Sequence, residues 1–333
     1  MPYHAGEGSG KIRHAADIHR RYLNRRYHHG KGPSMSATRW TASTPLDGDI
    51  SMVVADMDGT LLDGDSSIPE GFWPLLERMQ QAGIEFVPAS GRQIFTLRDM
   101  FGEAMPSGSF IAENGNLVVA QGHTVSVTAL PADAVMRMID ILALADLPQG
   151  HDVGMVVCGE HSAYINRRDT PFVDECRKYY HRLEFLDDLH EAVTGERADR
   201  VLKVAVFDFG DVRVPADELF APLRGQYQVV VSGAHWVDIM DVNTDKRRGV
   251  LALQQQLGIT PAQTMVFGDY LNDLQMLSAG QWSFAMANAY PDVVDQARFI
   301  APANTDQGVL RVIEAMLDAR ENPEASGVSH VAD

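Results

Sequence analysis

Two pairs of acidic residues follow strand-like stretches in distant parts of the chain. Asp56 and Asp58 come directly after residues 50–55, an apolar run rich in β-branched residues that predicts a buried parallel strand. Asp269 and Asp273 follow a second run of this kind. Ligands of open α/β sheets bind at the carboxyl ends of the strands. The sequence therefore predicts that these carboxylates meet at one edge of a sheet.

A carboxylate pair such as Asp56 and Asp58 can divide the work of covalent catalysis. One carboxylate attacks the substrate, and the other moves protons. An acidic turn after a strand is also typical of an ordinary loop, so these two residues alone leave both interpretations open. The rest of the chain favours the catalytic one, because further polar residues stand beside other predicted strands and helices. They are Ser90, Gly91, Arg92, Asn114, Lys246 and Asn272.

The order of these sites resembles that of the haloacid dehalogenase superfamily of phosphohydrolases. More narrowly, it resembles the Cof-type sugar-phosphate phosphatases, which carry a large cap between the second and third motifs. The resemblance covers about residues 50–317 and includes the strings at 112–115 and 283–289. It implies a Mg²⁺-dependent phosphatase that acts on small phosphorylated metabolites, sugar phosphates first, through an aspartyl-phosphate.

The resemblance also implies roles for the acids and the lysine. Asp56 would be the nucleophile and a metal ligand, while Asp58 would serve as the acid–base and bind the metal through its backbone carbonyl. Asp269 would supply a further carboxylate to the metal, which prefers oxygen ligands. Asp273 would bind through water or orient Lys246, and Lys246 would neutralise the phosphoryl group.

The remaining positions fall into two groups. Ser90 and the Gly91 N–H would donate to phosphoryl oxygens, where charge must be held in the transition state, and Asn272 would contact a phosphate oxygen or a water on the metal. Three residues keep two interpretations each. Thr60 holds the acids or is a plain turn residue, Arg92 binds substrate or pairs with a core acid, and Asn114 lines the site or only forms a turn.

Composition excludes several functional classes. A net charge of −17 argues against nucleic acid as the main partner, and the sequence has no apolar run long enough to predict a membrane span. An N-terminal secretory signal is not expected either. Cys158 and Cys176 are expected to be reduced core residues. The expected location is therefore the cytoplasm.

Alternating strands and helices predict an α/β fold with a doubly wound parallel sheet. We expect this core to comprise residues 49–127 and 234–320, with an α+β cap inserted at 128–233. Residues 321–333 are expected to be frayed.

Residues 1–48 carry eight Lys or Arg against three acids, which favours a disordered basic tail. The alternatives are a nucleic-acid or membrane arm, a metal site at His28 and His29, and a true start at Met35.

Three rival functions remain. A phosphomutase of the same superfamily would use the same aspartyl-phosphate and return the phosphoryl group to a sugar. A phospho-acceptor signalling domain also uses acids and a lysine, but the inserted cap and Asp58 count against it. A non-catalytic protein that binds a phosphorylated metabolite is disfavoured by the complete set of acids.

Overall fold

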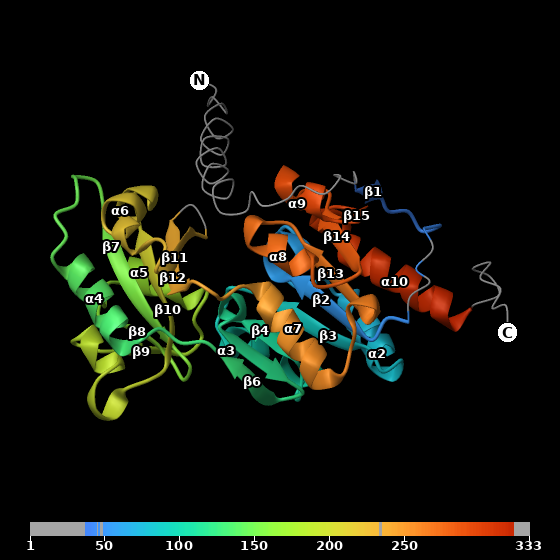
Figure 1. Ribbon diagram of the computed structural model, residues 1–333, viewed down its shortest axis with the longest axis horizontal. Helices are drawn as coiled ribbons and strands as arrows, with labels where there is room; N and C mark the ends of the chain where they lie inside the picture. The colour runs from blue at the N-terminus through green and yellow to red at the C-terminus, as the bar shows by residue number, and fades with distance from the viewer. Residues whose placement is uncertain (1–36, 45, 47–48, 233–234, 323–333) are drawn as a thin grey trace, which may run out of the picture. The chain divides into compact units, whose positions relative to one another are not determined.

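The computed structural model describes residues 37–44, 46, 49–232 and 235–322. The strands in this part of the chain form two sheets, one of nine strands and one of six (Figure 1). The mixed α/β architecture confirms the predicted fold class. No helix in the described ranges is long and apolar enough to cross a membrane.

The nine-stranded sheet is built around a strand that ends in Asp56. Its strands are β1 (Thr38–Arg39), β2 (Met52–Asp56), β3 (Glu85–Ala89), β4 (Phe110–Ala112), β5 (Leu117–Ala120), β6 (His123–Val127), β13 (Thr264–Gly268), β14 (Trp282–Met286) and β15 (Phe299–Ala301). They lie in the order β1-β15-β14-β13-β2-β3-β4-β5-β6. In this order the pairs from β1 to β4 are parallel, and β5 and β6 add an antiparallel hairpin at one edge.

Both faces of this sheet are covered by helices, which explains why its strands are continuously apolar. Along β2, Val53 and Ala55 face one hydrophobic cluster, whereas Met52 and Val54 face another, because successive side chains of a strand point to opposite faces. The helices are α2 (Phe72–Gln81), α3 (Ile94–Phe101), α7 (Lys246–Leu257), α8 (Leu274–Leu277), α9 (Pro291–Gln296) and α10 (Gly308–Glu321). Residues of α2, α3 and α10 pack on the first face, and residues of α7, α8 and α9 pack on the second.

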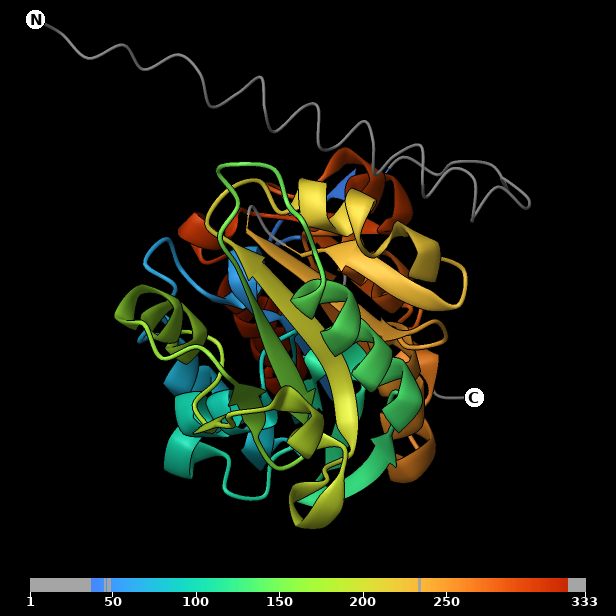
Figure 2. The same ribbon diagram turned by 90° about the vertical axis from the view of Figure 1, so that its left-hand side faces the viewer.

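The six-stranded sheet is formed by a continuous segment between β6 and α7. Its strands are β7 (Val153–Gly159), β8 (Ala163–Ile165), β9 (Leu183–Phe185), β10 (Val201–Asp208), β11 (Tyr227–Val231) and β12 (Trp236–Asp241), and its helices are α4 (Ala132–Ala143), α5 (Thr170–Arg177) and α6 (Arg213–Glu218). The order β11-β12-β10-β7-β8-β9 is antiparallel except at β8 and β9. Figure 2 shows α4 across one face of this sheet, where residues of α4 and α6 share a cluster, while α5 packs on the other face.

Strand β12 differs from the sequence expectation. The predicted core resumes at residue 234, yet β12 pairs with β10 and β11 and belongs to the six-stranded sheet. An apolar strand pattern records burial but not which sheet provides the hydrogen-bond partners, so the pattern placed this strand in the wrong sheet. The chain returns to the nine-stranded sheet region only at α7.

The N-terminal segment also differs from expectation where it is described. The predicted tail spans 1–48, but Thr38 and Arg39 form β1 and pair with β15. Trp40 is only 7% exposed and belongs to the hydrophobic cluster on the α2 side of the sheet. Composition averages over the segment and hides a single anchoring aromatic residue. Residues 1–36 lie outside the described residues, and they include most of the expected tail, His28, His29 and Met35. Residues 323–333, most of the expected frayed end, also lie outside them.

Both cysteines, Cys158 and Cys176, are buried and free.

Candidate active site

The carboxyl ends of adjacent parallel strands bring the predicted residues together. In the register of the sheet, Asp56 pairs with Ala89 on β3, and Ala55 pairs with Phe267 on β13. Ser90 therefore follows one neighbouring strand and Asp269 follows the other. Figure 1 shows β2 between β13 and β3 in the interior of the sheet. Parallel pairing places Asp56 and Asp269, which are more than 200 residues apart in the sequence, at one edge.

Three carboxylates form a compact group at this edge. Asp56, Asp269 and Asp273 each offer an oxygen, and these atoms all lie within 4.8 Å of one another. The backbone of the same turn holds Asp273 in place. Its Oδ2 accepts hydrogen bonds from the backbone N–H groups of Asp269 at 3.0 Å and Tyr270 at 3.1 Å. This group fits a hard cation with oxygen ligands.

Lys246 neutralises part of this charge. The side chain is fully buried, and its ammonium forms ion pairs with Asp56 and with Asp273, the latter at 2.7 Å. Burial opposes the charge, but the two carboxylates outweigh it, and the pKa of Lys246 lies above its usual value. One ammonium against three carboxylates leaves two negative charges, which a divalent cation would balance.

The excess of negative charge also affects the pKa values of Asp56 and Asp269. Burial and the neighbouring Asp273 raise the pKa of Asp56 well above its usual value, although Lys246 acts in the opposite direction. Burial and Asp273 also raise the pKa of Asp269 to about 6. Crowded carboxyl groups of this kind are typical of functional sites.

The turn after β2 is shaped for close approach to Asp269. Gly59 has φ = +81°, and a side chain there would collide with the Asp269 carboxylate. Thr60 donates a hydrogen bond from Oγ1 to Asp269 Oδ1 at 2.8 Å, so of its two interpretations the contact with an acid is the one observed. Asn288 donates to the Gly59 carbonyl at 2.8 Å and braces the turn from another loop.

Asp58 is not part of the group of three carboxylates and pairs with Arg92. The guanidinium donates from Nε to Asp58 Oδ2 at 3.0 Å and from Nη2 to Oδ1 at 2.6 Å. The Asp58 side chain is 53% exposed, so it remains accessible from the cavity. The carboxylate of Asp58 is outside the metal-type cluster, and the expected contact through its backbone carbonyl stays a prediction.

The loops after β3 and β4 are bonded to each other. The backbone N–H of Asn114 donates to the Ser90 carbonyl at 2.9 Å, and Asn272 donates from Nδ2 to Asn114 Oδ1 at 3.2 Å. Asn114 has φ = +56° and also lines the cavity, so both of its interpretations hold. Ser90 is buried, and its Oγ accepts a hydrogen bond from the Arg92 N–H at 3.2 Å.

These residues open into a cavity of about 480 Å³ that the two sheets line together. Residues from the nine-stranded sheet region are Asp56, Asp58, Ser90, Gly91, Arg92, Asn114, Asp269, Tyr270 and Asn272. Residues from the six-stranded sheet region are Glu175, Tyr179, Tyr180, Lys203, Ser232, His235, Trp236 and Asp238. Three aromatic rings of the second set pack edge to face, with Trp236 between Tyr179 and Tyr180. The wall that the six-stranded sheet contributes therefore holds both aromatic rings and charged side chains.

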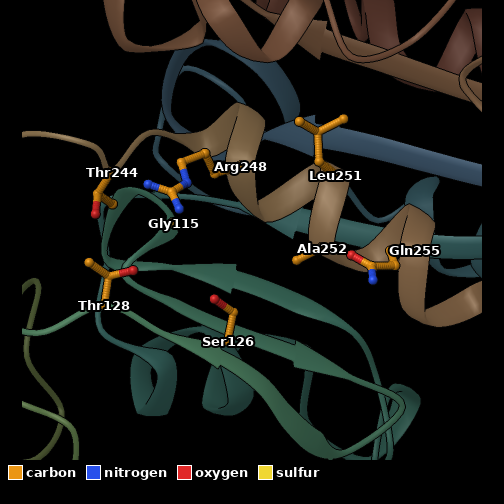
Figure 3. Close-up of a pocket in the computed structure, with 8 residues that line it drawn as sticks. All are labelled: Gly115, Ser126, Thr128, Thr244, Arg248, Leu251, Ala252 and Gln255. Carbon is orange, nitrogen blue, oxygen red and sulfur yellow. The ribbon is translucent and has the colours of Figure 1, made fainter.

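The residues of this second wall are not among those predicted from the sequence. A signal was present, because Lys203 and Asp238 are charged residues in the middle of apolar strands, where charge is rare unless it is paired. A smaller cavity of about 220 Å³ lies elsewhere, between α7, β6 and the segments that connect the two sheets (Figure 3). Its lining, within the described ranges, includes none of the candidate catalytic side chains.

The family follows from comparison with known proteins. Residues 53–313 match the model of the haloacid dehalogenase-like hydrolases. The chain belongs to this family. A phosphatase of Escherichia coli K12, 5-amino-6-(5-phospho-D-ribitylamino)uracil phosphatase YbjI, is 31% identical over 80% of this chain and 96% of its own length. HMP-PP phosphatase of Cronobacter sakazakii is 27% identical over 72% of this chain and 85% of its own length. This haloacid dehalogenase-like hydrolase is therefore a phosphatase, as the sequence resemblance predicts.

Solved structures agree on the fold. The crystal structure of SMU.1108c from Streptococcus mutans has a TM-score of 0.70 at 24% identity, covering 81% of this chain and 99% of that chain. A haloacid dehalogenase-like hydrolase from Bacteroides thetaiotaomicron has a TM-score of 0.70 at 22% identity, covering 80% and 99%. Likeness at this level of identity establishes the architecture alone.

Proposed function

We propose that this protein is a Mg²⁺-dependent phosphatase that hydrolyses sugar or sugar-alcohol phosphates through an aspartyl-phosphate on Asp56. One observation carries the proposal: Asp56, Asp269, Asp273 and Lys246 converge at the edge of the sheet, beside a cavity that also holds Asp58 and Ser90. The proposed location is the cytoplasm, where the two free cysteines would stay reduced.

In the first step a carboxylate oxygen of Asp56 attacks phosphorus, and the bond from phosphorus to the leaving alcohol oxygen breaks. Lys246 holds Oδ1 of this carboxylate and limits its rotation. Asp58 first leaves the ion pair with Arg92 and takes up a proton from solvent, and it then gives this proton to the leaving oxygen. The substrate phosphate competes for the same guanidinium and so favours this release.

In the second step water attacks the phosphorus of the aspartyl-phosphate, and Asp58 takes the proton from that water. The bond between phosphorus and Asp56 breaks, which restores the carboxylate and releases phosphate. Ser90 and the Gly91 N–H would donate to the phosphoryl oxygens during both steps, where such donors act on developing charge.

The carboxylate group fits Mg²⁺ in ligand chemistry and in charge. Asp56 and Asp269 would hold the ion, and Asp273 would orient Lys246, to which it is bonded, or bind the ion through water. When bound, the ion would neutralise the phosphoryl oxygens and thereby lower the barrier to attack.

The six-stranded sheet would act as a cap over the acids. Its aromatic side chains, Tyr179, Tyr180 and Trp236, would exclude water and contact the part of the substrate beyond the phosphate. The E. coli relative is named for a compound in which a ribityl phosphate is attached to a uracil ring. This combination suits a cavity with acids at one end and aromatic rings at the other.

The test is a screen of phosphorylated metabolites for Mg²⁺-dependent phosphate release. The screen should include sugar phosphates, sugar-alcohol phosphates and ribityl phosphates joined to a pyrimidine. We expect turnover of at least one member of this set, and free phosphate as the product. An isomeric sugar phosphate as product would indicate a phosphomutase, and binding without turnover would indicate a metabolite-binding protein.

A further inference from the structure

Lys203 occupies an unusual position in the middle of β10. Its side chain is only 4% exposed, and its ammonium lies 2.9 Å from Glu113 Oε2 and 3.4 Å from Asp238 Oδ1. Asp238 belongs to β12 of the same sheet, whereas Glu113 lies in the turn after β4 of the other sheet. This buried charge cluster therefore joins the two sheets.

The same ammonium also reaches the loop that follows β3. Lys203 Nζ donates to the backbone carbonyl of Gly91 at 2.9 Å. The peptide group that carries this carbonyl continues into the N–H of Arg92, which donates to Ser90 Oγ at 3.2 Å. One peptide plane thus connects an ammonium of the six-stranded sheet with a hydroxyl of the nine-stranded sheet.

This connection restrains the Ser90 side chain through the hydrogen bond that Oγ accepts from the Arg92 N–H. Because Oγ already accepts a hydrogen bond from Arg92, the hydrogen of Ser90 is free to donate to another acceptor. Ser90 lines the cavity beside Asp56, where a transferring phosphoryl group would lie. A donor is effective there only if it is oriented before the reaction begins.

The turn at Glu113 supports the same loop. The Glu113 N–H donates to the Arg92 carbonyl at 3.1 Å. Glu113 has φ = +50°, a backbone conformation that residues other than glycine rarely adopt. Burial opposes the charge on Lys203, but Asp238 and Glu113 outweigh it and raise the pKa of this lysine above its usual value. The two carboxylates therefore favour the charged form of Lys203 at this junction.

We propose that Lys203 is a positioning residue: through the Gly91–Arg92 peptide it orients the Ser90 hydroxyl toward the transferring phosphoryl group. The inference rests on the proposed phosphatase function and adds a dependence of phosphoryl binding on the six-stranded sheet. Glu113 and Asp238 hold the ammonium in place. Lys203 itself contacts no reacting atom in this role.

The variant for the test is Lys203→Met/Glu113→Gln, which removes one positive and one negative charge together, because a lone Lys203→Met would leave two buried carboxylates facing each other. The matched control is Arg200→Met/Glu160→Gln, an ion pair in the same sheet region whose arginine side chain is 61% exposed. With p-nitrophenyl phosphate and Mg²⁺ we expect kcat/KM to fall about 10²-fold in the first variant, as for a misplaced catalytic group. The control should match the wild type.

The deciding comparison is a double-mutant cycle with Ser90→Ala. If Lys203 acts through Ser90, adding Lys203→Met/Glu113→Gln to Ser90→Ala should cost less than about a further 3-fold, since the hydroxyl is already absent. Losses that multiply would overturn the inference, because a side chain that merely supports the fold acts independently of Ser90. So would wild-type kcat/KM in Lys203→Met/Glu113→Gln.

Calorimetry of inorganic phosphate binding in Mg²⁺ provides a readout besides turnover. The same non-additive weakening is expected in the dissociation constant. A wild-type protein that binds phosphate but hydrolyses nothing would refute the proposed function. The double-mutant cycle measured with phosphate dissociation constants would still test the role of Lys203. If Lys203→Met/Glu113→Gln does not fold, as seen by circular dichroism, Lys203→Met/Asp238→Asn enters the same cycle and leaves Glu113 intact.

Discussion

The two sheets contribute to the shared cavity in different ways. The nine-stranded sheet supplies Asp56, Ser90 and Asp269 from the ends of parallel strands, where the backbone turns and side chains converge. The six-stranded sheet supplies Trp236 and Asp238 from within a strand, where side chains stand on the face of the sheet. Under the proposed function, the strand ends of the nine-stranded sheet would act on the phosphoryl group, whereas the aromatic side chains of the six-stranded sheet would contact the rest of the substrate.

The largest effect should come from Asp56. Asp56→Asn should abolish phosphate release, because an amide does not attack phosphorus here. Asp65→Asn, an exposed acid in the following loop, is the matched control and should retain wild-type turnover. Substantial turnover by Asp56→Asn would contradict a catalytic role for Asp56.

Metal removal should have a comparable effect at the same edge. EDTA should abolish turnover and Mg²⁺ should restore it, because three carboxylates and one lysine leave an uncompensated negative charge. Asp269→Asn should raise the Mg²⁺ concentration for half-maximal activity by more than about 10-fold. Full turnover in EDTA would contradict the metal requirement.

Asp58→Asn should reduce turnover of a sugar phosphate about 10²–10⁴-fold, as expected for a lost general acid. For p-nitrophenyl phosphate the first step should be affected less, since that leaving group needs no proton. Comparing the two substrates by stopped-flow separates proton donation from attack. An equal loss of the first step for both would mean that Asp58 positions the substrate rather than protonates it.

Substitution of an aromatic residue of the six-stranded sheet should weaken substrate binding and leave the chemical step unchanged. Tyr179→Ala should raise KM for a metabolite substrate about 3- to 10-fold, the range expected for a lost aromatic contact. It should leave kcat/KM for acetyl phosphate, whose leaving group is small, close to wild type. Phe209→Ala, at an exposed aromatic residue of the same sheet region, is the control. An equal loss for both substrates would erase the distinction between the two walls.

The smallest effect on turnover should come from Trp40→Ala. The free energy of unfolding should fall by about 3 kcal/mol, because a large buried side chain is removed, while kcat/KM stays unchanged. A urea titration measures the first quantity, and Arg39→Ala, at an exposed neighbour, is the control. Unchanged stability would mean that the segment does not anchor the sheet.

The parts of the fold that the sequence revealed are those that local patterns encode. An apolar run followed by an acid marks a strand end, so the sequence alone predicts Asp56 and Asp269 at one sheet edge. The short strands β9 and β15 carry too little pattern to be recognised. The sheet to which β12 belongs depends on hydrogen-bond partners far away in the sequence.

Local sequence patterns also predict one wall of the site better than the other. Gly59 and Thr60 lie beside Asp56 in the sequence, and their closeness to Asp269 follows from adjacent strands. Lys203 reaches Gly91 across 112 residues, through a packing of two sheets that no local pattern describes. The pairing of Asp58 with Arg92 was open for the same reason, since several acids could have met that guanidinium.

The role of Asp56 as the nucleophile is best tested by a rapid-quench measurement of protein-bound phosphate. The wild-type protein, Asp58→Asn and Asp56→Asn are mixed with radiolabelled substrate and Mg²⁺, then quenched in acid. We predict acid-stable, hydroxylamine-labile label in a burst, more of it in Asp58→Asn because hydrolysis of the aspartyl-phosphate lacks its base, and none in Asp56→Asn. Label that persists in Asp56→Asn, or label in neither the wild type nor Asp58→Asn, would contradict Asp56 as the nucleophile.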